Sequence, residues 1–190
     1  MTDIQNARIL ILATDGFEQS ELEVPKSELS AKGAKVTVAA PEKTRSPGKI
    51  KGWDEIDWGS DVDVDLPLSQ VRAEDYDALV LPGGVINPDK LRGEPKAIET
   101  IKAFAASGKV IAAICHAPWL LAEADVIRGR AVTSVGSIKT DVKNAGGRWS
   151  DEEVVTDQGI VTSRTPKDLP AFIAKIVEEI GEGRHDRRAA

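Results

Sequence analysis

The chain has 190 residues, of which 41% are apolar and 29% charged, and its formal net charge is −6. A chain of this length can bury a substantial core, so we predict one domain over residues 1–190, with its core at about 8–180 and a polar C-terminal tail at 182–190. The acidic balance lacks the basic surface that neutralises phosphates, which argues against stable binding to nucleic acid or to a membrane. We find no leader-like segment and expect a cytoplasmic protein.

Apolar runs of strand length alternate with helical patterns along the chain. We predict, in chain order, strands at 8–13, 35–40, 78–82, 109–114 and 131–133 and a hairpin at 154–163, with helices at 18–32, 95–107, 117–124, 138–145 and 166–181. Near-continuous apolar strands separated by helices are typical of a parallel sheet covered on both faces. The predicted fold class is therefore α/β: a doubly wound, flavodoxin-like, mostly parallel sheet with helices on both faces. Residues 44–68 suggest a short strand pair outside this sheet.

The only cysteine, Cys115, ends the fourth of these strands and is followed at once by His116, with small residues around it and Pro118 at the start of the next helix. Such a strand-turn-helix forces its central residue into a strained backbone conformation and exposes the side chain above the sheet. The N-terminus of the following helix favours a thiolate. We therefore predict a reactive thiol, although a free cysteine is often only a small buried hydrophobe.

The carboxyl ends of parallel strands meet at one edge of a sheet, where the reactive crevice of this fold class lies. There we expect Glu18 after the first strand and the pair Gly83 and Gly84 after the third. A protonated Glu18 would donate a hydrogen bond to the sulfur; otherwise it compensates the helix dipole. The glycine N–H groups, with that of His116, would form an oxyanion hole; otherwise the pair is only a tight turn.

His116 is a candidate base, and Asp89, in the loop after Gly84, is a candidate to orient its ring. Adjacent residues on a turn can point apart, so a partly exposed turn histidine is the alternative. The chain contains no G-x-G-x-x-G, P-loop, H-E-x-x-H or C-x-x-C pattern, so we expect no cofactor and no metal. A lone cysteine has no resolving partner in its own chain.

Several segments together resemble the ThiJ/PfpI superfamily, within the class I glutamine-amidotransferase-like fold, and are most similar to its intracellular protease I (PfpI) branch of stress-response proteins. They are 13–18 (ATDGFE), 78–84 (ALVLPGG), 113–118 (AICHAP), 133–134 (TS) and 144–146 (NAG). The resemblance implies Cys115 as nucleophile, Glu18 bonded to its sulfur, His116 as the neighbouring base, and the N–H groups of Gly84 and His116 at the oxyanion position. It further implies a homo-oligomer, a dimer or larger, in which Asp89 of an adjacent subunit completes the triad.

The resemblance implies a cysteine-dependent enzyme acting on reactive carbonyls or their protein adducts, with glyoxalase or deglycase chemistry. Intracellular peptide hydrolysis is the alternative within enzymes. A peroxide-sensing redox protein or a holdase chaperone that uses the same cysteine is the alternative of another class. The expected partners are accordingly a small carbonyl substrate or a modified or unfolded protein.

Overall fold

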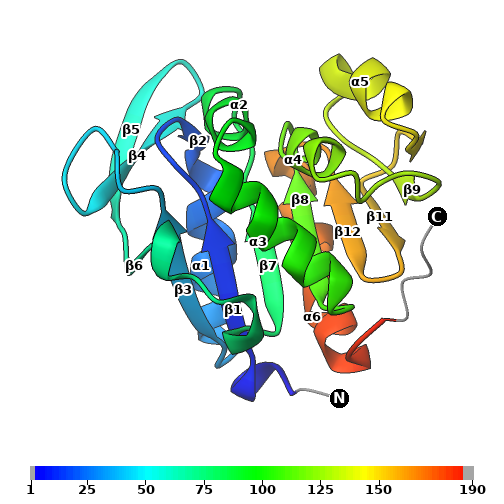
Figure 1. The fold of residues 1–190 in the computed structure, drawn as a ribbon, viewed down its shortest axis with the longest axis horizontal. Coiled ribbons are helices and arrows are strands. Elements are labelled where there is room, and N and C mark those ends of the chain that lie inside the picture. The colour runs from blue at the N-terminus through cyan, green and yellow to red at the C-terminus, as the bar shows by residue number, and fades with distance from the viewer. Residues whose placement is uncertain (1–2, 186–190) are drawn as a thin grey trace.

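A seven-stranded sheet forms the centre of the structure, a computed structural model that describes residues 3–185 (Figure 1). Its strand order is β11-β12-β8-β7-β1-β3-β6, and every neighbouring pair is parallel except β11 with β12. The strands are β1 (Arg8–Leu12), β3 (Lys35–Ala40), β6 (Leu66–Pro67), β7 (Ala78–Leu81), β8 (Val110–Ile114), β11 (Val154–Asp157) and β12 (Ile160–Ser163). Strands β7 and β8 are wholly buried, and β1 is buried after Arg8, as expected for apolar strands covered on both faces. The predicted mostly parallel sheet is confirmed.

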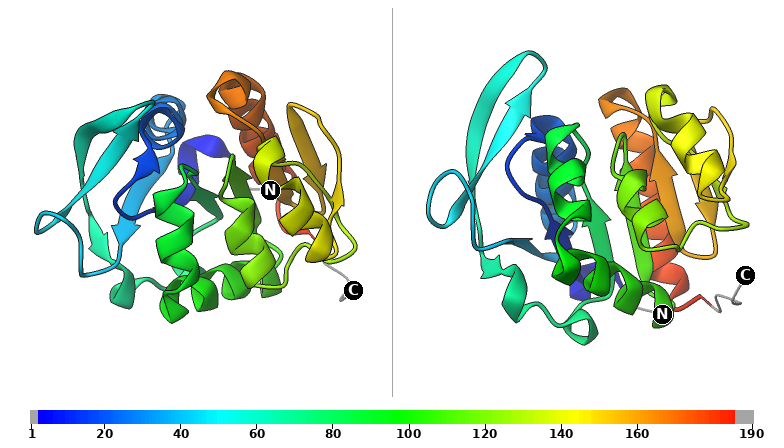
Figure 2. Two further views of the ribbon diagram at one scale, coloured as in Figure 1. Left: turned by 90° about the horizontal axis from the view of Figure 1, so that it is seen from above. Right: turned by 45° about the horizontal axis from the view of Figure 1, so that its top comes forward.

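Helices cover both faces of this sheet, as the view along its edge shows (Figure 2, left). One face carries α1 (Gln19–Ala31) and α6 (Leu169–Glu182), and the other carries α2 (Ile86–Arg92), α3 (Pro95–Ala106), α4 (Pro118–Glu123) and α5 (Lys139–Asn144). Two apolar clusters correspond to these two layers. The first joins Leu22 of α1 and Phe172 of α6, and the second joins Phe104 of α3 and Leu120 of α4.

Two small sheets lie outside the central one. Strands β4 (Lys49–Asp54) and β5 (Asp57–Asp63) form an antiparallel pair that joins β2 (Phe17–Glu18), while β9 (Ala131–Val132) pairs with β10 (Arg148–Trp149). The first confirms the strand pair predicted within 44–68. Asp15 ties that pair to the end of β1, because its carboxylate accepts hydrogen bonds from Arg45 N (2.8 Å) and Lys51 N (2.9 Å).

Most ends of the predicted elements differ from prediction by one or two residues. The two-residue strands β6 and β10 were not predicted, and β6, within 44–68, joins the central sheet instead of lying outside it. Three further differences concern the helices and the tail. The sequence analysis did not predict α2, whose Pro88 lies in the first helical turn, where a proline is tolerated. The last helix begins with a separate turn at Pro166–Asp168. His185, in the predicted tail, donates its backbone N–H to Gly108 O at 2.8 Å. Residues 186–190 of that tail lie outside the described residues.

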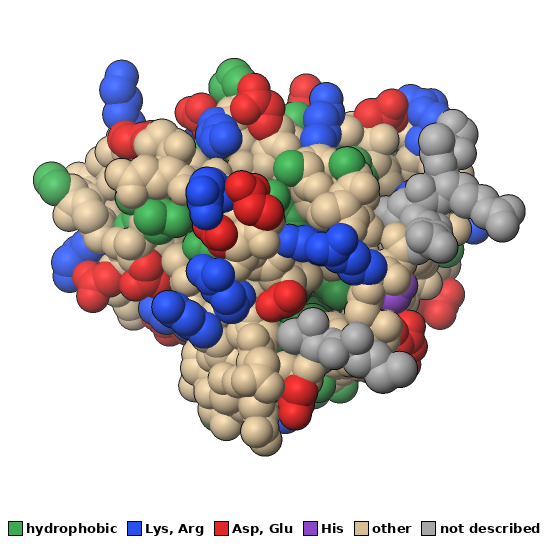
Figure 3. All heavy atoms as spheres, turned by 60° about the horizontal axis from the view of Figure 1, so that its bottom comes forward, with side chains coloured by type: hydrophobic (Ala, Val, Ile, Leu, Met, Phe, Trp, Pro, Cys, Tyr) green, Lys and Arg blue, Asp and Glu red, His purple; other side chains and the backbone are tan. Residues whose placement is uncertain are grey.

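The face at the amino ends of the parallel strands carries acidic and basic side chains interspersed (Figure 3). No block of positive charge covers this face, in keeping with the net charge of −6. Among residues 3–185, none of the helices has both the length and the apolar character needed to cross a bilayer.

Candidate active site

Cys115 lies at the carboxyl end of β8, in a backbone conformation that residues other than glycine rarely adopt, with φ of 64°. Two backbone hydrogen bonds hold it there: its N–H donates to Ser163 O (3.1 Å), and its carbonyl accepts from Val135 N (3.0 Å). This confirms the predicted strained turn. Strain of this kind costs about 1–3 kcal/mol and persists only where the surrounding structure fixes it.

The carboxyl group beside the sulfur belongs to Glu21 of α1. Its Oε2 accepts a hydrogen bond from Gly83 N at 2.8 Å, and the carboxyl group hydrogen-bonds to the Cys115 thiol. Glu21 is fully buried, and its Oε1 accepts no hydrogen bond from the residues that the structure describes. Burial raises the pKa of Glu21 to about 8, although the Gly83 hydrogen bond acts to lower it. The carboxyl group is therefore protonated at pH 7.

Glu18, which the resemblance placed at the sulfur, does not occupy that position. It precedes α1 and is half-buried; burial raises its pKa, and the nearby Asp54 and Glu55 raise it further. The buried face of α1 consists of Glu21, Leu22, Pro25 and Leu29. Glu18 lies before the helix with extended backbone, whereas Glu21 lies on the buried face within the first turn of α1. The assignment of the sulfur-bonded carboxyl group is therefore corrected to Glu21.

The two glycines after β7 do different things. Gly84 N and His116 N donate hydrogen bonds to the Cys115 sulfur, whereas Gly83 N is taken by Glu21. The predicted oxyanion donors therefore reduce to Gly84 and His116. Gly83 has a steric role instead, because a Cβ there would lie 2.7 Å from both Cys115 Cβ and Ile114 O.

Burial raises the pKa of the Cys115 thiol, and the neighbouring Glu21 raises it further, while the N–H groups of Gly84 and His116 lower it. The net direction is upward, so the expectation of an ionised thiol at rest is not met. Helix α4 begins beyond His116 and has only six residues, which limits what its dipole contributes.

His116 turns its ring back toward the sulfur. Its Nδ1 lies 3.2 Å from Cys115 Sγ, and its Nε2 lies 3.3 Å from Ser137 Oγ. The ring also packs against Trp119, with centroids 5.2 Å apart. Burial lowers the pKa of His116, so the imidazole is neutral at pH 7 and able to accept a proton from the thiol.

Asp89 does not meet His116 within one chain. It is exposed in the first turn of α2, and both ring nitrogens of His116 already face Cys115 and Ser137. Its contribution from a second copy stays a prediction. The neighbouring Asn87, which the sequence analysis did not single out, is buried and joins two strand ends: it accepts from Thr14 N (2.7 Å) and donates to Pro82 O (2.8 Å).

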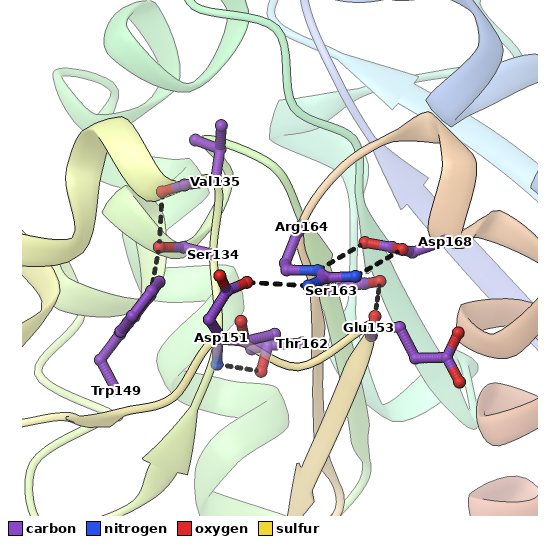
Figure 4. A network of polar contacts seen from close by, with 10 residues as sticks. Ser134, Val135, Trp149, Asp151, Glu153, Thr162, Ser163, Arg164 and Asp168 are labelled. Atoms are coloured by element: carbon purple, nitrogen blue, oxygen red, sulfur yellow. Dashed lines mark hydrogen bonds and ion pairs between the residues drawn. The ribbon is translucent and has the colours of Figure 1, made fainter.

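A polar network surrounds the end of β12 (Figure 4). Arg164 donates through Nε and Nη2 to both oxygens of Asp168, each at 3.0 Å, and through Nη1 to Asp151 at 2.8 Å. Ser163, whose carbonyl accepts from Cys115 N, donates its hydroxyl to Glu153 O. The network fixes the end of β12, where Ser163 O accepts the hydrogen bond from Cys115 N.

Glu179, Glu182 and His185 present oxygen and nitrogen donors that lie within 4.8 Å of one another. This group is at the end of α6, at the opposite end of the sheet from Cys115 (Figure 1). His185 Nε2 lies 3.2 Å from Glu179 Oε2, so a histidine-carboxylate pair accounts for the contact.

The sequence and the fold both match known proteins. The DJ-1/PfpI family profile matches residues 7–179. Protein/nucleic acid deglycase 2 of Escherichia coli is 42% identical over 175 residues, which cover 92% of this chain and 98% of that protein. The putative cysteine protease YraA of Bacillus subtilis is 39% identical over 166 residues, which cover 87% of this chain and 93% of that protein. The crystal structure of Drosophila melanogaster DJ-1beta superposes with a TM-score of 0.80 at 30% identity, covering 93% of this chain and 95% of that one. The chain therefore belongs to the DJ-1/PfpI family.

Proposed function

We propose that this protein is a cysteine-dependent deglycase that hydrolyses adducts of reactive α-oxoaldehydes with amines or thiols. The observation that carries the proposal is one thiol contacted by a neutral acid, a neutral imidazole and two N–H donors: Glu21, His116 and the backbone of Gly84 and His116. Relatives at about 40% identity named as deglycases support the same chemistry.

The first step is attack by the thiol at the aldehyde-derived carbon. As the S–C bond forms, His116 Nδ1, 3.2 Å away, takes the thiol proton. A base is needed because the thiol is not ionised at rest. When the substrate is a hemiaminal, the C–N bond breaks and the amine leaves with a proton. The N–H groups of Gly84 and His116 stabilise negative charge that develops on the substrate oxygen.

The remaining steps convert the hemithioacetal on Cys115 into an acid without any external oxidant. His116 moves a proton from the former aldehyde carbon to the adjacent carbonyl carbon by way of an enediol, which oxidises the first carbon to a thioester and reduces the second to an alcohol. Water then cleaves the thioester and restores the thiol. For methylglyoxal, one water is consumed and lactic acid is formed.

The decisive measurement is lactate formation, monitored by NMR. The substrates are methylglyoxal and its adduct with the side-chain amine of Nα-acetyl-lysine. Cys115→Ala is expected to abolish turnover, and His116→Gln to lower kcat by about 10²–10⁴-fold. His185→Gln is the matched control, because the second histidine lies at the other end of the sheet, and it should retain activity. Turnover by Cys115→Ala equal to that of the unaltered protein would refute the proposal.

The pKa values predict a pH profile with two limbs. At low pH, kcat/KM falls as His116 becomes protonated, and burial places that limb below the ordinary pKa of histidine. At high pH it falls as Glu21, whose pKa is about 8, ionises beside the sulfur. Glu21→Gln removes the alkaline limb, and an unchanged limb in that variant would exclude Glu21 as its source.

Peptide hydrolysis and peroxide sensing use the same sulfur and are separated by two assays. Release of a fluorophore from unstructured peptides at a rate matching lactate formation would favour a peptidase. Rapid gain of two oxygens by Cys115 in dilute peroxide would favour a sensor; the raised pKa of the thiol favours slow oxidation instead.

We further propose that the protein acts in the cytoplasm and forms a homo-oligomer. A reducing compartment suits a chain whose single cysteine must stay reduced. Val85, 55% exposed and four residues before Asp89, adds an apolar side chain to the surface where a second copy would bring that carboxylate. Light scattering measures the assembly, and a monomer at micromolar concentration would remove the cross-subunit role of Asp89.

A further inference from the structure

The ring of His116 is held from both ends, and the second partner comes from a segment that the sequence analysis did not associate with the site. Ser137 lies in the 3₁₀ turn Gly136–Ile138, between β9 and α5. Its Oγ is 3.3 Å from His116 Nε2, the nitrogen that faces away from the sulfur. This is the position at which a catalytic histidine ordinarily meets a carboxylate.

We propose that Ser137 is the positioning residue of His116 and fixes, within one chain, the tautomer that leaves Nδ1 free to take the thiol proton. The inference rests on the proposed function and extends it. In the resting site the Ser137 hydroxyl accepts the proton on Nε2, which leaves the Nδ1 lone pair facing Cys115 Sγ at 3.2 Å. When Nδ1 takes the thiol proton, Nε2–H continues to donate to the same oxygen.

The position of Ser137 is set by contacts on both sides of it. Val135 N donates to Cys115 O at 3.0 Å, so the residue that precedes the 3₁₀ turn is bonded to the strained residue. Ile138, 2% exposed, anchors its other end in the apolar cluster of that face. Beyond it, Asp141 accepts from Trp119 Nε1 at 2.8 Å, and Trp119 packs on the His116 ring. These contacts fix the Ser137 hydroxyl and the His116 ring relative to each other.

A neutral partner suits the charges around the ring. The groups near it are Glu21, which hydrogen-bonds to the sulfur, and Asp141 and Arg92, which contact Trp119. A carboxylate on Nε2 would stabilise the imidazolium ion and raise the pKa of His116. Serine holds the ring without adding charge, so His116 stays neutral at physiological pH.

The first test compares substitutions in the same turn. Ser137→Ala is expected to lower kcat about tenfold with KM unchanged, because the ring loses its orientation while the substrate contacts remain. Ser137→Thr keeps the hydroxyl and should restore most of the rate. Thr140→Ala, exposed in the adjoining first turn of α5, is the matched control and should leave kcat unchanged. Equal kcat values for all four proteins would overturn the proposal.

The second test changes the charge on Nε2. Ser137→Asp is expected to move the acid limb of kcat/KM to higher pH, because a carboxylate stabilises protonated His116. A merely structural role would lower the rate without moving the limb. A loss of rate in Asp89→Asn together with an unaffected Ser137→Ala would assign the role to Asp89 instead.

The third test does not depend on turnover, so it separates this proposal from the proposed function. Long-range ¹H–¹⁵N NMR of the His116 ring reports which nitrogen carries the proton. We expect the Nε2–H tautomer in the unaltered protein and in Ser137→Thr, and a mixture of tautomers in Ser137→Ala. An unchanged tautomer in Ser137→Ala would refute the positioning role even if the protein proves to be a deglycase. If the protein lacks deglycase activity but Ser137→Ala changes the tautomer as expected, the positioning role of Ser137 stands.

Discussion

Two buried carboxyl groups in this protein have pKa values shifted in opposite directions. Asp168 is 6% exposed, and its two carboxylate oxygens accept hydrogen bonds from Nε and Nη2 of Arg164, each at 3.0 Å (Figure 4). Burial acts to raise the pKa of Asp168, but Arg164 brings that pKa below its ordinary value. Glu21, 0% exposed, has a thiol and one backbone N–H for partners, and its pKa rises to about 8. The first is a charged structural pair; the second is a neutral acid.

The difference shows what the site requires. A cation near Glu21 would relieve the cost of its burial, as Arg164 does for Asp168, but would also ionise the carboxyl group and end its ability to donate a hydrogen bond to sulfur. An uncompensated buried acid is a common mark of functional sites. The comparison therefore separates a residue retained for stability from one retained at the expense of stability.

The largest expected effect is that of Glu21→Gln. At pH 7 folded Glu21 holds a proton that the unfolded chain has released, which destabilises the fold by about 3 kcal/mol at 1.36 kcal/mol per pH unit. Glutamine keeps the acceptor for Gly83 N and removes this cost, so thermal unfolding should occur at higher temperature. Lactate formation should fall by about tenfold, because an amide donates a weaker hydrogen bond to the sulfur than a protonated carboxyl group does.

The pH dependence of stability provides the control for that variant. Between pH 4.5 and about 8 the folded state binds one proton more than the unfolded state through Glu21, so the unaltered protein loses stability as pH rises through this window. Glu21→Gln should lack that component of the slope. Identical slopes for the two proteins would show that Glu21 is ionised in the fold and would remove the contrast with Asp168.

Asp168→Asn is expected to act in the opposite direction and more weakly. Arg164 would keep Asp151 but lose a carboxylate that binds it through two hydrogen bonds, so the melting temperature should fall by roughly 2–4 °C at pH 7. Because the pKa of Asp168 is lowered in the fold, its contribution is present above its ordinary pKa and is lost as pH falls below it. The melting temperatures of the two proteins should therefore converge on acidification, and the rate of lactate formation should change by less than about twofold.

The smallest effect is expected for an ion pair on the surface. Lys175 and Glu178 are 2.7 Å apart on α6, and the Glu178 side chain is 54% exposed. Glu178→Gln should change the melting temperature by less than about 1 °C, since solvent and salt screen such pairs. A change as large as that of Asp168→Asn would mean that burial does not distinguish the two pairs.

The order and type of the main elements follow from the sequence because their patterns are strong. The apolar residues of β1, β7 and β8 are contiguous, and Gly33 and Gly108 end the helices before β3 and β8 with positive φ. Helix α2 was not predictable in this way. It has seven residues, follows two glycines and contains a proline, so its tertiary contacts rather than its local pattern determine it.

The sequence predicted the site residues that follow the ends of strands, but not those that reach the site from a helix or a turn. Cys115, His116 and Gly84 follow strands directly and lie together as expected. Glu21 lies on a helix, where its distance from Cys115 depends on how α1 is rotated against the sheet. One signal was available: an acid on the same helical face as Leu22 and Pro25. Ser137 had no such signal, because it reaches the ring from a short 3₁₀ turn 21 residues later.

The edges of the central sheet bear on how copies of this chain can associate. At one edge, β6 has two residues, and Pro67 has no N–H to offer. At the other, β11 runs antiparallel to its neighbour and has four residues. Neither edge offers a long template for another strand, and blunted edges of this kind protect a sheet from fibrillar growth. A complex that this protein forms with itself through these two edges would therefore use side-chain surfaces instead of continuing the central sheet from one molecule to the next.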